Sequence, residues 1–297
     1  MASPVSQMLL SGKIITIISI IFSLTSVSIY TSFLLSIFWF KTIKKVPEFS
    51  LFYCHFVYDI GYSLAMFSNL VIVLLSTTDA VQFFIENRNV AFFIIYPSFL
   101  IGSARLLLVL IIEIDRTFAT YFPIIFHNYR KLIPTFSILS ITIIYALFDV
   151  SVMFIFCEYR IDLPPGCTNM LCAFNTCYRS YWLTYEKVVN SLIISLSLLL
   201  SIKLFMMNYN KQYINADLKR ANQLALLDTC IIVIFYMTPS NIITFFPNFY
   251  TYLGPVTSFC KNMGLIVEGY LIWKHLRKRR DNKKSIVVKS KSSTMGN

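Results

Sequence analysis

The residues of this chain whose types and spacing could do chemistry are charged side chains within apolar stretches. Asp115 and Arg116 stand side by side at the end of one stretch, and Arg105 lies eleven residues earlier. Eleven residues exceed three full helical turns by only about 20°, so the two arginines share a face that points into a helical bundle. An ionisable group inside a membrane helix costs about 2.5–3.5 kcal/mol, so each needs a partner or a role.

Asp59, near the middle of another apolar stretch, is the partner that we expect for Arg105. We predict an intramembrane ion pair between them, acting either as a static bridge or as a switch. Lys261 is a second intramembrane cation, and its place fits a charge in a ligand pocket, another partner for Asp59, or a side chain that extends to the membrane surface. Asp228 and Glu268 lie in the inner halves of their stretches, where they either accept hydrogen bonds or are solvated by water.

Enzymatic chemistry is not indicated by the sequence. Histidines occur at His55, His127 and His275, with no spacing typical of a metal site, and there is no nucleophile elbow. We therefore expect no catalytic residue, no metal and no cofactor.

The composition is that of a membrane protein. Of the 297 residues, 57% are hydrophobic and 13% charged, and the mean hydropathy is +0.67. Soluble domains have about 25% charged residues, so a soluble enzyme, a disordered chain and a free nucleic-acid binder are excluded. The net charge is +12, but much of the positive charge lies in residues 274–297. A basic tail beside a membrane favours the anionic lipids of the inner leaflet over nucleic acid.

Seven stretches are long and apolar enough to cross the hydrocarbon core, which takes about 20 residues. They are residues 14–40, 51–76, 90–114, 132–156, 183–207, 224–246 and 255–273. We expect an all-α membrane protein, with one seven-helix domain over residues 1–273 and a cytoplasmic tail over residues 274–297. With the N-terminus outside, nineteen Lys and Arg fall on the inner side against five outside, which predicts this orientation.

The outer segment before the fifth stretch contains four cysteines, Cys157, Cys167, Cys172 and Cys177. This side of the membrane is oxidising, so we expect two disulfides within the segment. Four cysteines allow three connectivities, and the sequence does not choose among them. A segment closed in this way would form a rigid lid over the entrance to a ligand site.

The residues around Arg116 resemble the DRY-x-A-x-x-x-P-L element of rhodopsin-like G-protein-coupled receptors. Asp115, Arg116, Ala119 and Pro123 match, and Ile124 replaces the Leu. The resemblance implies that Asp115 holds Arg116 in the resting state. It also implies that Arg116 meets the inserted C-terminal helix of a Gα subunit when the helix ends separate.

Other positions depart from the rhodopsin-like pattern, and the whole chain resembles the nematode serpentine chemoreceptors of class BC. The Trp before Pro239 is missing, and Ala91 stands where rhodopsin-like receptors carry a disulfide cysteine. The nematode resemblance lies in residues 102–105, 115–124, 126–130, 164–167, 172, 177 and 181–182. It implies a receptor for small environmental or odorant-like chemicals, on the plasma membrane of sensory cilia in chemosensory neurons, that activates a heterotrimeric G protein. The alternatives are a ligand-gated channel or transporter and an orphan peptide receptor.

The ligand pocket of such a receptor lies in the outer half of the bundle. The residues that we expect there are apolar and aromatic, with a few hydroxyls and amides, which suits a small, weakly polar ligand. They are Tyr96, Ser98, Phe99, Gly102, Tyr236, Met237, Asn241, Lys261 and Asn262.

Overall fold

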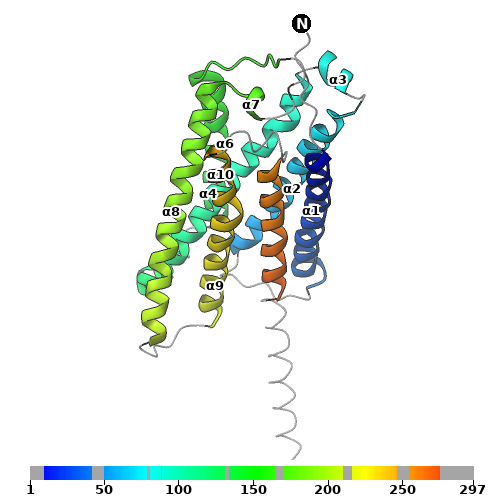
Figure 1. Ribbon diagram of the computed structural model, residues 1–297. Helices are drawn as coiled ribbons and strands as arrows, with labels where there is room; N and C mark the ends of the chain where they lie inside the picture. The colour runs from blue at the N-terminus through cyan, green and yellow to red at the C-terminus, as the bar shows by residue number, and fades with distance from the viewer. Residues whose placement is uncertain are drawn as a thin grey trace, which may run out of the picture.

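The computed structural model describes residues 10–41, 50–78, 81–87, 89–130, 134–164, 167, 170–209, 216–245 and 255–274. Within these ranges the chain forms a bundle of helices and no strand (Figure 1). The helices are α1 (Leu10–Leu34), η1 (Leu35–Trp39), α2 (Ser50–Leu75), α3 (Val81–Glu86), α4 (Val90–Tyr121), α5 (Pro123–Arg130), α6 (Thr135–Ser151), η3 (Val152–Phe156), α7 (Met170–Ala173), α8 (Thr176–Tyr209), α9 (Ala216–Ile231), η4 (Ile232–Met237) and α10 (Thr238–Phe245). A further helix covers residues 256–274. The predicted tail, apart from its first residue, lies outside the described ranges.

Six segments are long and apolar enough to cross a membrane. They are Leu10–Trp39, Ser50–Leu75, Val90–Tyr121, Thr135–Phe156, Thr176–Met207 and Asn222–Ile242. They coincide with the first six predicted stretches. The seventh predicted stretch is also helical, but Lys261, Glu268 and Lys274 make this short helix more polar than the others. The third helix is longer than predicted, so Asp115 and Arg116 lie inside it and not at its end.

The long helix α4 crosses the middle of the bundle and packs against α2, α6, α8 and α9 (Figure 1). Large apolar side chains such as Phe136 and Leu147 of α6 remain exposed on the outside, as expected where helices face lipid. Tyr30, Phe56, Leu108 and other buried residues form the core between α1, α2 and α4. The high apolar content of the chain therefore serves two purposes: some apolar side chains fill the core, and others form an outer surface suited to lipid.

Up to Ser26 the buried face of α1 consists of small residues, which lets α1 approach α2 closely. Gly12, Thr16, Ser19, Ser23 and Ser26 recur at helical spacing on this face and are all buried. Their hydroxyls bond to backbone carbonyls, for example Thr16 to Gly12 in its own helix at 2.8 Å and Ser23 to Ser63 of α2 at 2.6 Å. A polar stripe can therefore lie inside the bundle without an unmet hydroxyl donor.

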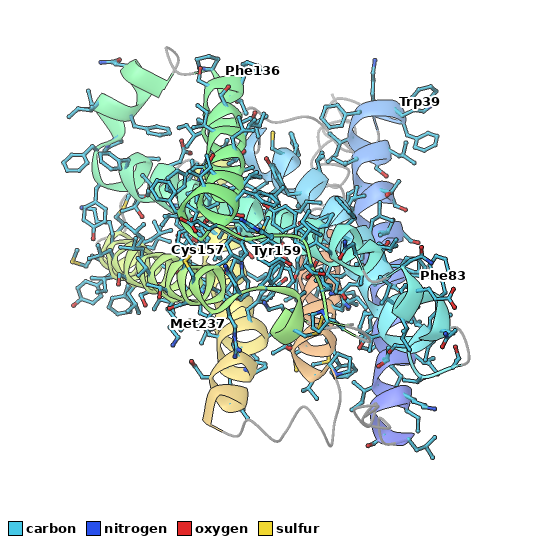
Figure 2. The ribbon with its side chains drawn as sticks, turned by 90° about the horizontal axis from the view of Figure 1, so that it is seen from above. Trp39, Phe83, Phe136, Cys157, Tyr159 and Met237 are labelled. Carbon is cyan, nitrogen blue, oxygen red and sulfur yellow. A yellow bond between two sulfur atoms is a disulfide. The ribbon has the colours of Figure 1, made fainter. Side chains whose placement is uncertain are left out.

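Two disulfides close the outer segment between η3 and α8. Cys157 is bonded to Cys177 and Cys167 to Cys172, so the second bridge is nested within the first. Both lie inside the segment, as predicted. Viewed from above, Cys157 lies nearer the middle of the bundle than Phe136 or Trp39 at its edge (Figure 2).

An aromatic cluster fills the space beneath this segment. Phe92 of α4 packs against Phe174 and Tyr159, with ring centroids 6.2 and 5.5 Å apart. The Tyr159 hydroxyl donates to the Ala173 carbonyl at 2.5 Å, and burial raises its pKa. Tyr178 donates to Asp149 of α6 at 2.7 Å, which gives this buried carboxylate a structural partner. The outer segment is therefore a packed cap.

Close packing at Gly264 leaves no room for a larger side chain at this position. A Cβ at this position would lie 2.8 Å from Phe235 Cβ, so Gly264→Ala must push helix 256–274 away from η4. Overpacking of this kind costs about 1–3 kcal/mol, and the unfolding temperature of the purified protein should fall. The control is Gly61→Ala, whose Cβ would meet Ile101 at an ordinary 3.7 Å and which should keep wild-type stability. Equal unfolding temperatures for the two variants would contradict this prediction.

The two disulfides should differ in their contribution to stability. The Cys157–Cys177 bridge spans 20 residues and the Cys167–Cys172 bridge spans 5. On the loop-entropy model the longer closure stabilises the cap by about 1 kcal/mol more. Replacing each pair by serines and measuring thermal unfolding tests this order. The idea fails if loss of the shorter bridge is the more damaging.

Candidate functional site

An ion pair lies in the C-terminal part of α4. Arg116 Nη2 donates to Asp115 Oδ2 at 2.6 Å, and both side chains are buried. One turn further on, the Thr120 hydroxyl donates to the Arg116 carbonyl at 2.8 Å and accepts from Asn222 Nδ2 of α9 at 2.9 Å. This contact fastens the inner end of α9 to α4 directly beside the pair.

The two other matched residues shape the end of α4. Ala119 is buried, where its small side chain permits close packing. Helix α4 ends at Tyr121, and Pro123 opens α5, a position that suits a residue without a backbone N–H. The Tyr121 hydroxyl donates to the Leu199 carbonyl at 3.0 Å, which links this end of α4 to α8.

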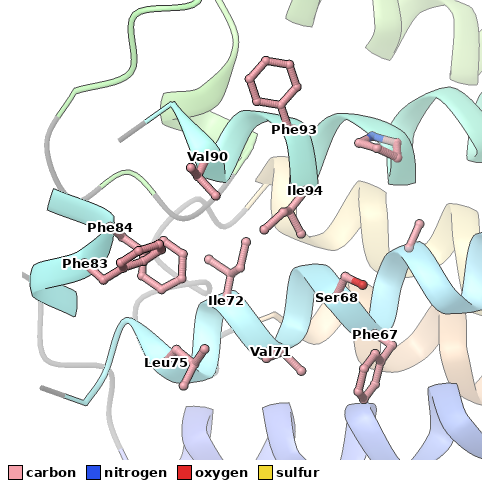
Figure 3. Close-up of a pocket in the computed structure, with 12 residues that line it drawn as sticks. Phe67, Ser68, Val71, Ile72, Leu75, Phe83, Phe84, Val90, Phe93 and Ile94 are labelled. Atoms are coloured by element: carbon pink, nitrogen blue, oxygen red, sulfur yellow. The ribbon is translucent and has the colours of Figure 1, made fainter. Parts of the chain in front are cut away.

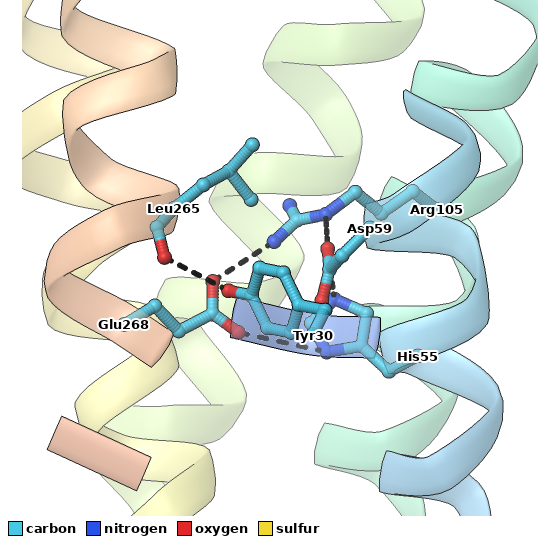
Figure 4. A network of polar contacts seen from close by, with 6 residues as sticks. All are labelled: Tyr30, His55, Asp59, Arg105, Leu265 and Glu268. Atoms are coloured by element: carbon cyan, nitrogen blue, oxygen red, sulfur yellow. Dashed lines mark hydrogen bonds and ion pairs between the residues drawn. The ribbon is translucent and has the colours of Figure 1, made fainter. Parts of the chain in front are cut away.

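The structure brings Asp59 and Arg105 together in the centre of the bundle and adds a second carboxylate (Figure 4). Arg105 Nε donates to Asp59 Oδ1 at 2.5 Å, and Arg105 Nη2 donates to Glu268 Oε2 at 3.0 Å. All three side chains are at most 3% exposed. One guanidinium therefore joins α2, α4 and helix 256–274. The charge on Glu268 is compensated by Arg105 in a buried position, which favours the hydrogen-bonding alternative over solvation.

Tyr30 and His55 complete this cluster. The Tyr30 hydroxyl donates to the Leu265 carbonyl at 3.0 Å, and the His55 ring lies 3.6 Å from Asp59 and 3.8 Å from Glu268. Pairing of two carboxylates with one arginine is what makes such burial tolerable, since an unpaired buried charge is far more costly.

His55, Asp59 and Glu268 are also a set of metal-ligand types, whose nearest atoms lie within 4.8 Å of one another. Spacing along the chain could not indicate this set, because Glu268 comes from a distant helix. In the structure Arg105 already contacts both carboxylates, and its guanidinium supplies the positive charge there. We therefore assign the set to the ion cluster.

Lys261 forms a second ion pair nearer the outer end of the bundle. Its Nζ donates to Glu186 Oε1 of α8 at 3.1 Å. It also lies 5.7 Å from the ring centroids of Trp182 and Tyr236. Glu186, not Asp59, is thus the partner of Lys261. The Tyr236 ring is shared, because the Arg105 guanidinium carbon lies 5.3 Å from the same centroid.

Two of the four pocket residues predicted on α4 pack against the cap. The rings of Tyr96 and Phe99 contact Phe174, and Ser98 donates to the Ile95 carbonyl in its own helix. Gly102 faces Tyr62, which a Cβ would approach to 3.1 Å.

The other predicted pocket residues do not all face the same part of the bundle. Tyr236 is buried beside Lys261, and Met237 is half-buried. Asn241 is exposed on the outside of α10. Asn262 is fully buried and donates to the Ser19 carbonyl of α1 at 3.3 Å. The structure therefore joins Tyr236 and Lys261 and places Asn241 and Asn262 elsewhere.

A groove of about 440 Å³ lies between α2, α3 and α4, and none of the predicted pocket residues lines it (Figure 3). Its lining is almost wholly apolar and includes Leu75, Phe83, Phe93 and Pro97. Phe83 and Phe93 are more than half exposed, so the groove opens on the outside of the bundle.

The sequence analysis missed two carboxylates of these sites. It did not identify Glu186 as the partner of Lys261, and it did not identify Glu268 as a partner of Arg105. The signal that could have found them is charge balance, because the intramembrane cations Arg105 and Lys261 both require carboxylates. Glu268 lies outside the motif around Arg116, and Glu186 lies near the start of the stretch of residues 183–207, at the edge of a predicted membrane span. Only the packed structure shows which carboxylate each cation meets.

These features define a seven-helix membrane receptor with paired charges along its core. The chain belongs to the Srbc family of serpentine type 7TM GPCR chemoreceptors, whose family model matches residues 8–280. The match includes all seven helices and confirms the predicted fold class and family. This is a family of receptors and not of enzymes. No curated protein matches the chain.

Removing the positive charge of Arg105 should strongly destabilise the protein. Arg105→Met leaves Asp59 and Glu268 buried without a counter-charge, which should cost about 3–5 kcal/mol of stability. Adding Asp59→Asn and Glu268→Gln removes both charges and should restore most of the loss. Thermal unfolding of the purified variants measures both effects. If the triple variant is no more stable than Arg105→Met, the guanidinium does not compensate these carboxylates.

Proposed function

We propose that this chemoreceptor binds a small molecule in the outer half of the bundle and activates a heterotrimeric G protein at the inner end of α4. The observation that carries the proposal is the buried Asp115–Arg116 pair, at 2.6 Å, in a chain of this receptor family. A charged pair of this kind is a switchable contact, because either member can exchange its partner for another.

The coupling step follows from the contacts around the pair. Asn222 of α9 bonds to Thr120, one turn from Arg116. Outward movement of α9 breaks this contact and opens the space beside Arg116. The guanidinium can then leave Asp115 and donate to backbone carbonyls of an inserted Gα helix. Ala119 leaves room for that helix, and Pro123 directs the chain away from it.

The Arg105 cluster is the element that we expect to relay ligand binding inward. It joins three helices in one set of contacts, and Tyr236 links it to Lys261 above. A shift of the Lys261 ammonium changes the electrostatic field at the Tyr236 ring, which the Arg105 guanidinium also contacts. The Asp59–Arg105 pair then acts as a switch and not only as a static bridge.

The cellular setting that we propose follows from the charges and the family. The bias of Lys and Arg supports an orientation with the N-terminus outside and the tail inside, next to the anionic inner leaflet. The receptor then lies in the plasma membrane, in sensory cilia of chemosensory neurons. The cap covers the outer entrance of the bundle.

Arg116→Ala should abolish G-protein activation. The receptor is expressed with a promiscuous Gα and screened with small molecules for second messenger, and the variant should lose at least tenfold in response at equal surface expression. Asp115→Asn should raise basal activity, because it weakens the hold on Arg116. Arg160→Ala, which removes an exposed arginine at the opposite end of the bundle, is the matched control and should respond as wild type. A ligand-gated current that persists in Arg116→Ala without Gα would instead favour a channel.

A further inference from the structure

The Lys261–Glu186 pair is more accessible than the other ion pairs in the core. Its two side chains are 14% and 13% exposed, whereas Arg105, Asp59 and Glu268 are at most 3% exposed. Lys261 lies in the second turn of helix 256–274, and Glu186 lies in the outer third of α8, at the end of the bundle that carries the cap. Both charges therefore keep partial exposure at the end of the bundle that carries the disulfides, whereas the Arg105 cluster is almost fully buried.

Aromatic rings flank the pair on two sides. Trp182 and Tyr236 each lie 5.7 Å from Lys261 Nζ, within the range of cation–π attraction. The Trp182 indole is fixed, because its Nε1 donates to Ser103 Oγ of α4 at 3.0 Å. The Lys261 ammonium therefore stands in a defined place between two rings and one carboxylate.

The backbone around Tyr236 brings these groups together. Tyr236 belongs to the π-helical turn η4, and such turns are frequent at functional sites. Gly264 lets helix 256–274 approach this turn closely, since any Cβ there would lie 2.8 Å from Phe235. A π-helical turn and a close helix contact thus meet at the ring beside Lys261.

Charge complementarity restricts what can bind at this pair. A cationic ligand would draw Glu186 away from Lys261, and an anionic ligand would draw Lys261 away from Glu186. Either would leave one partly buried charge without a partner, which is unfavourable. A ligand with both charges leaves neither unpaired.

The spacing of the pair points to one kind of zwitterion. In an α-amino acid the ammonium nitrogen and a carboxylate oxygen lie about 3 Å apart. This matches the 3.1 Å between Lys261 Nζ and Glu186 Oε1. Set side by side with the pair, the ligand carboxylate accepts from Lys261 and its ammonium donates to Glu186, so four charges alternate.

We propose that Lys261 and Glu186 recognise the carboxylate and ammonium groups of a free α-amino acid, with an apolar side chain against Trp182 and Tyr236. This differs from the weakly polar ligand expected from the sequence, because Glu186 was not recognised there as part of the site. Its role in signalling rests on the proposed function, but binding itself requires no G protein.

Binding to the purified full-length receptor tests the proposal. The probes are the protein-forming α-amino acids, together with the methyl ester and the N-acetyl derivative of each, which keep only one charge. Ligand-induced shifts in unfolding temperature, followed by titration, should show binding of an apolar amino acid and at least tenfold weaker binding of both derivatives. Absence of binding by every free amino acid, or equal binding of a blocked form, would overturn the proposal.

Variants of the pair separate recognition from folding. Glu186→Gln and Lys261→Gln should each weaken binding at least tenfold. Lys187→Gln changes the neighbouring exposed residue and should bind as wild type. If the single variants do not fold, the double variant Glu186→Gln with Lys261→Gln is used, because it removes both charges and leaves no buried charge unpaired. Wild-type affinity in that double variant would overturn the proposal.

The same assay distinguishes this proposal from the G-protein proposal. Arg116→Ala should bind the amino acid normally, since Arg116 lies at the other end of α4. Amino-acid binding without any Arg116-dependent signal would contradict the coupling step and leave the recognition site intact. An Arg116-dependent response to other molecules, with no amino acid bound, would contradict the recognition site alone.

Discussion

One guanidinium holds the centre of this protein together. Arg105 donates to carboxylates from two other helices, and all three side chains are at most 3% exposed, so an uncompensated charge there would be very costly. The positions of α2, α4 and helix 256–274 are therefore coupled, because none of them can move far without exposing a charge. The hydrophobic surfaces set which residues are buried, but this contact sets how the three helices are aligned in depth. The shared Tyr236 ring extends that coupling to the outer pair.

The sequence predicted the helices well because membrane spans have a simple physical signature. Apolar length located all seven, and the resemblance around Arg116 led to the family. Helical periodicity placed Arg105 and Arg116 on one face, and the structure buries both. The sequence could not predict the partners of Lys261 and Glu268, because contacts between distant helices depend on helix rotation and depth. It also could not choose among three disulfide connectivities, which depend on the path of the cap.

The predicted ligand site shows the same division. Tyr236 and Lys261 are adjacent because both face inward at a similar depth. Asn262 is the next residue after Lys261, and about 100° of helical rotation turns it towards α1. A polar residue in the right helix is therefore not enough to predict a pocket. Its direction decides whether it meets a ligand or supports packing.

The nested disulfides have a consequence for how the protein is made. Both bridges join cysteines within one segment of the chain, between η3 and the first turn of α8. In the proposed orientation their thiols reach the oxidising compartment together, before the last helices have been synthesised. The cap can thus be oxidised and closed during membrane insertion, whereas the Arg105 cluster waits for Glu268 near the end of translation. The outer end of the receptor can mature early, and its core is completed last.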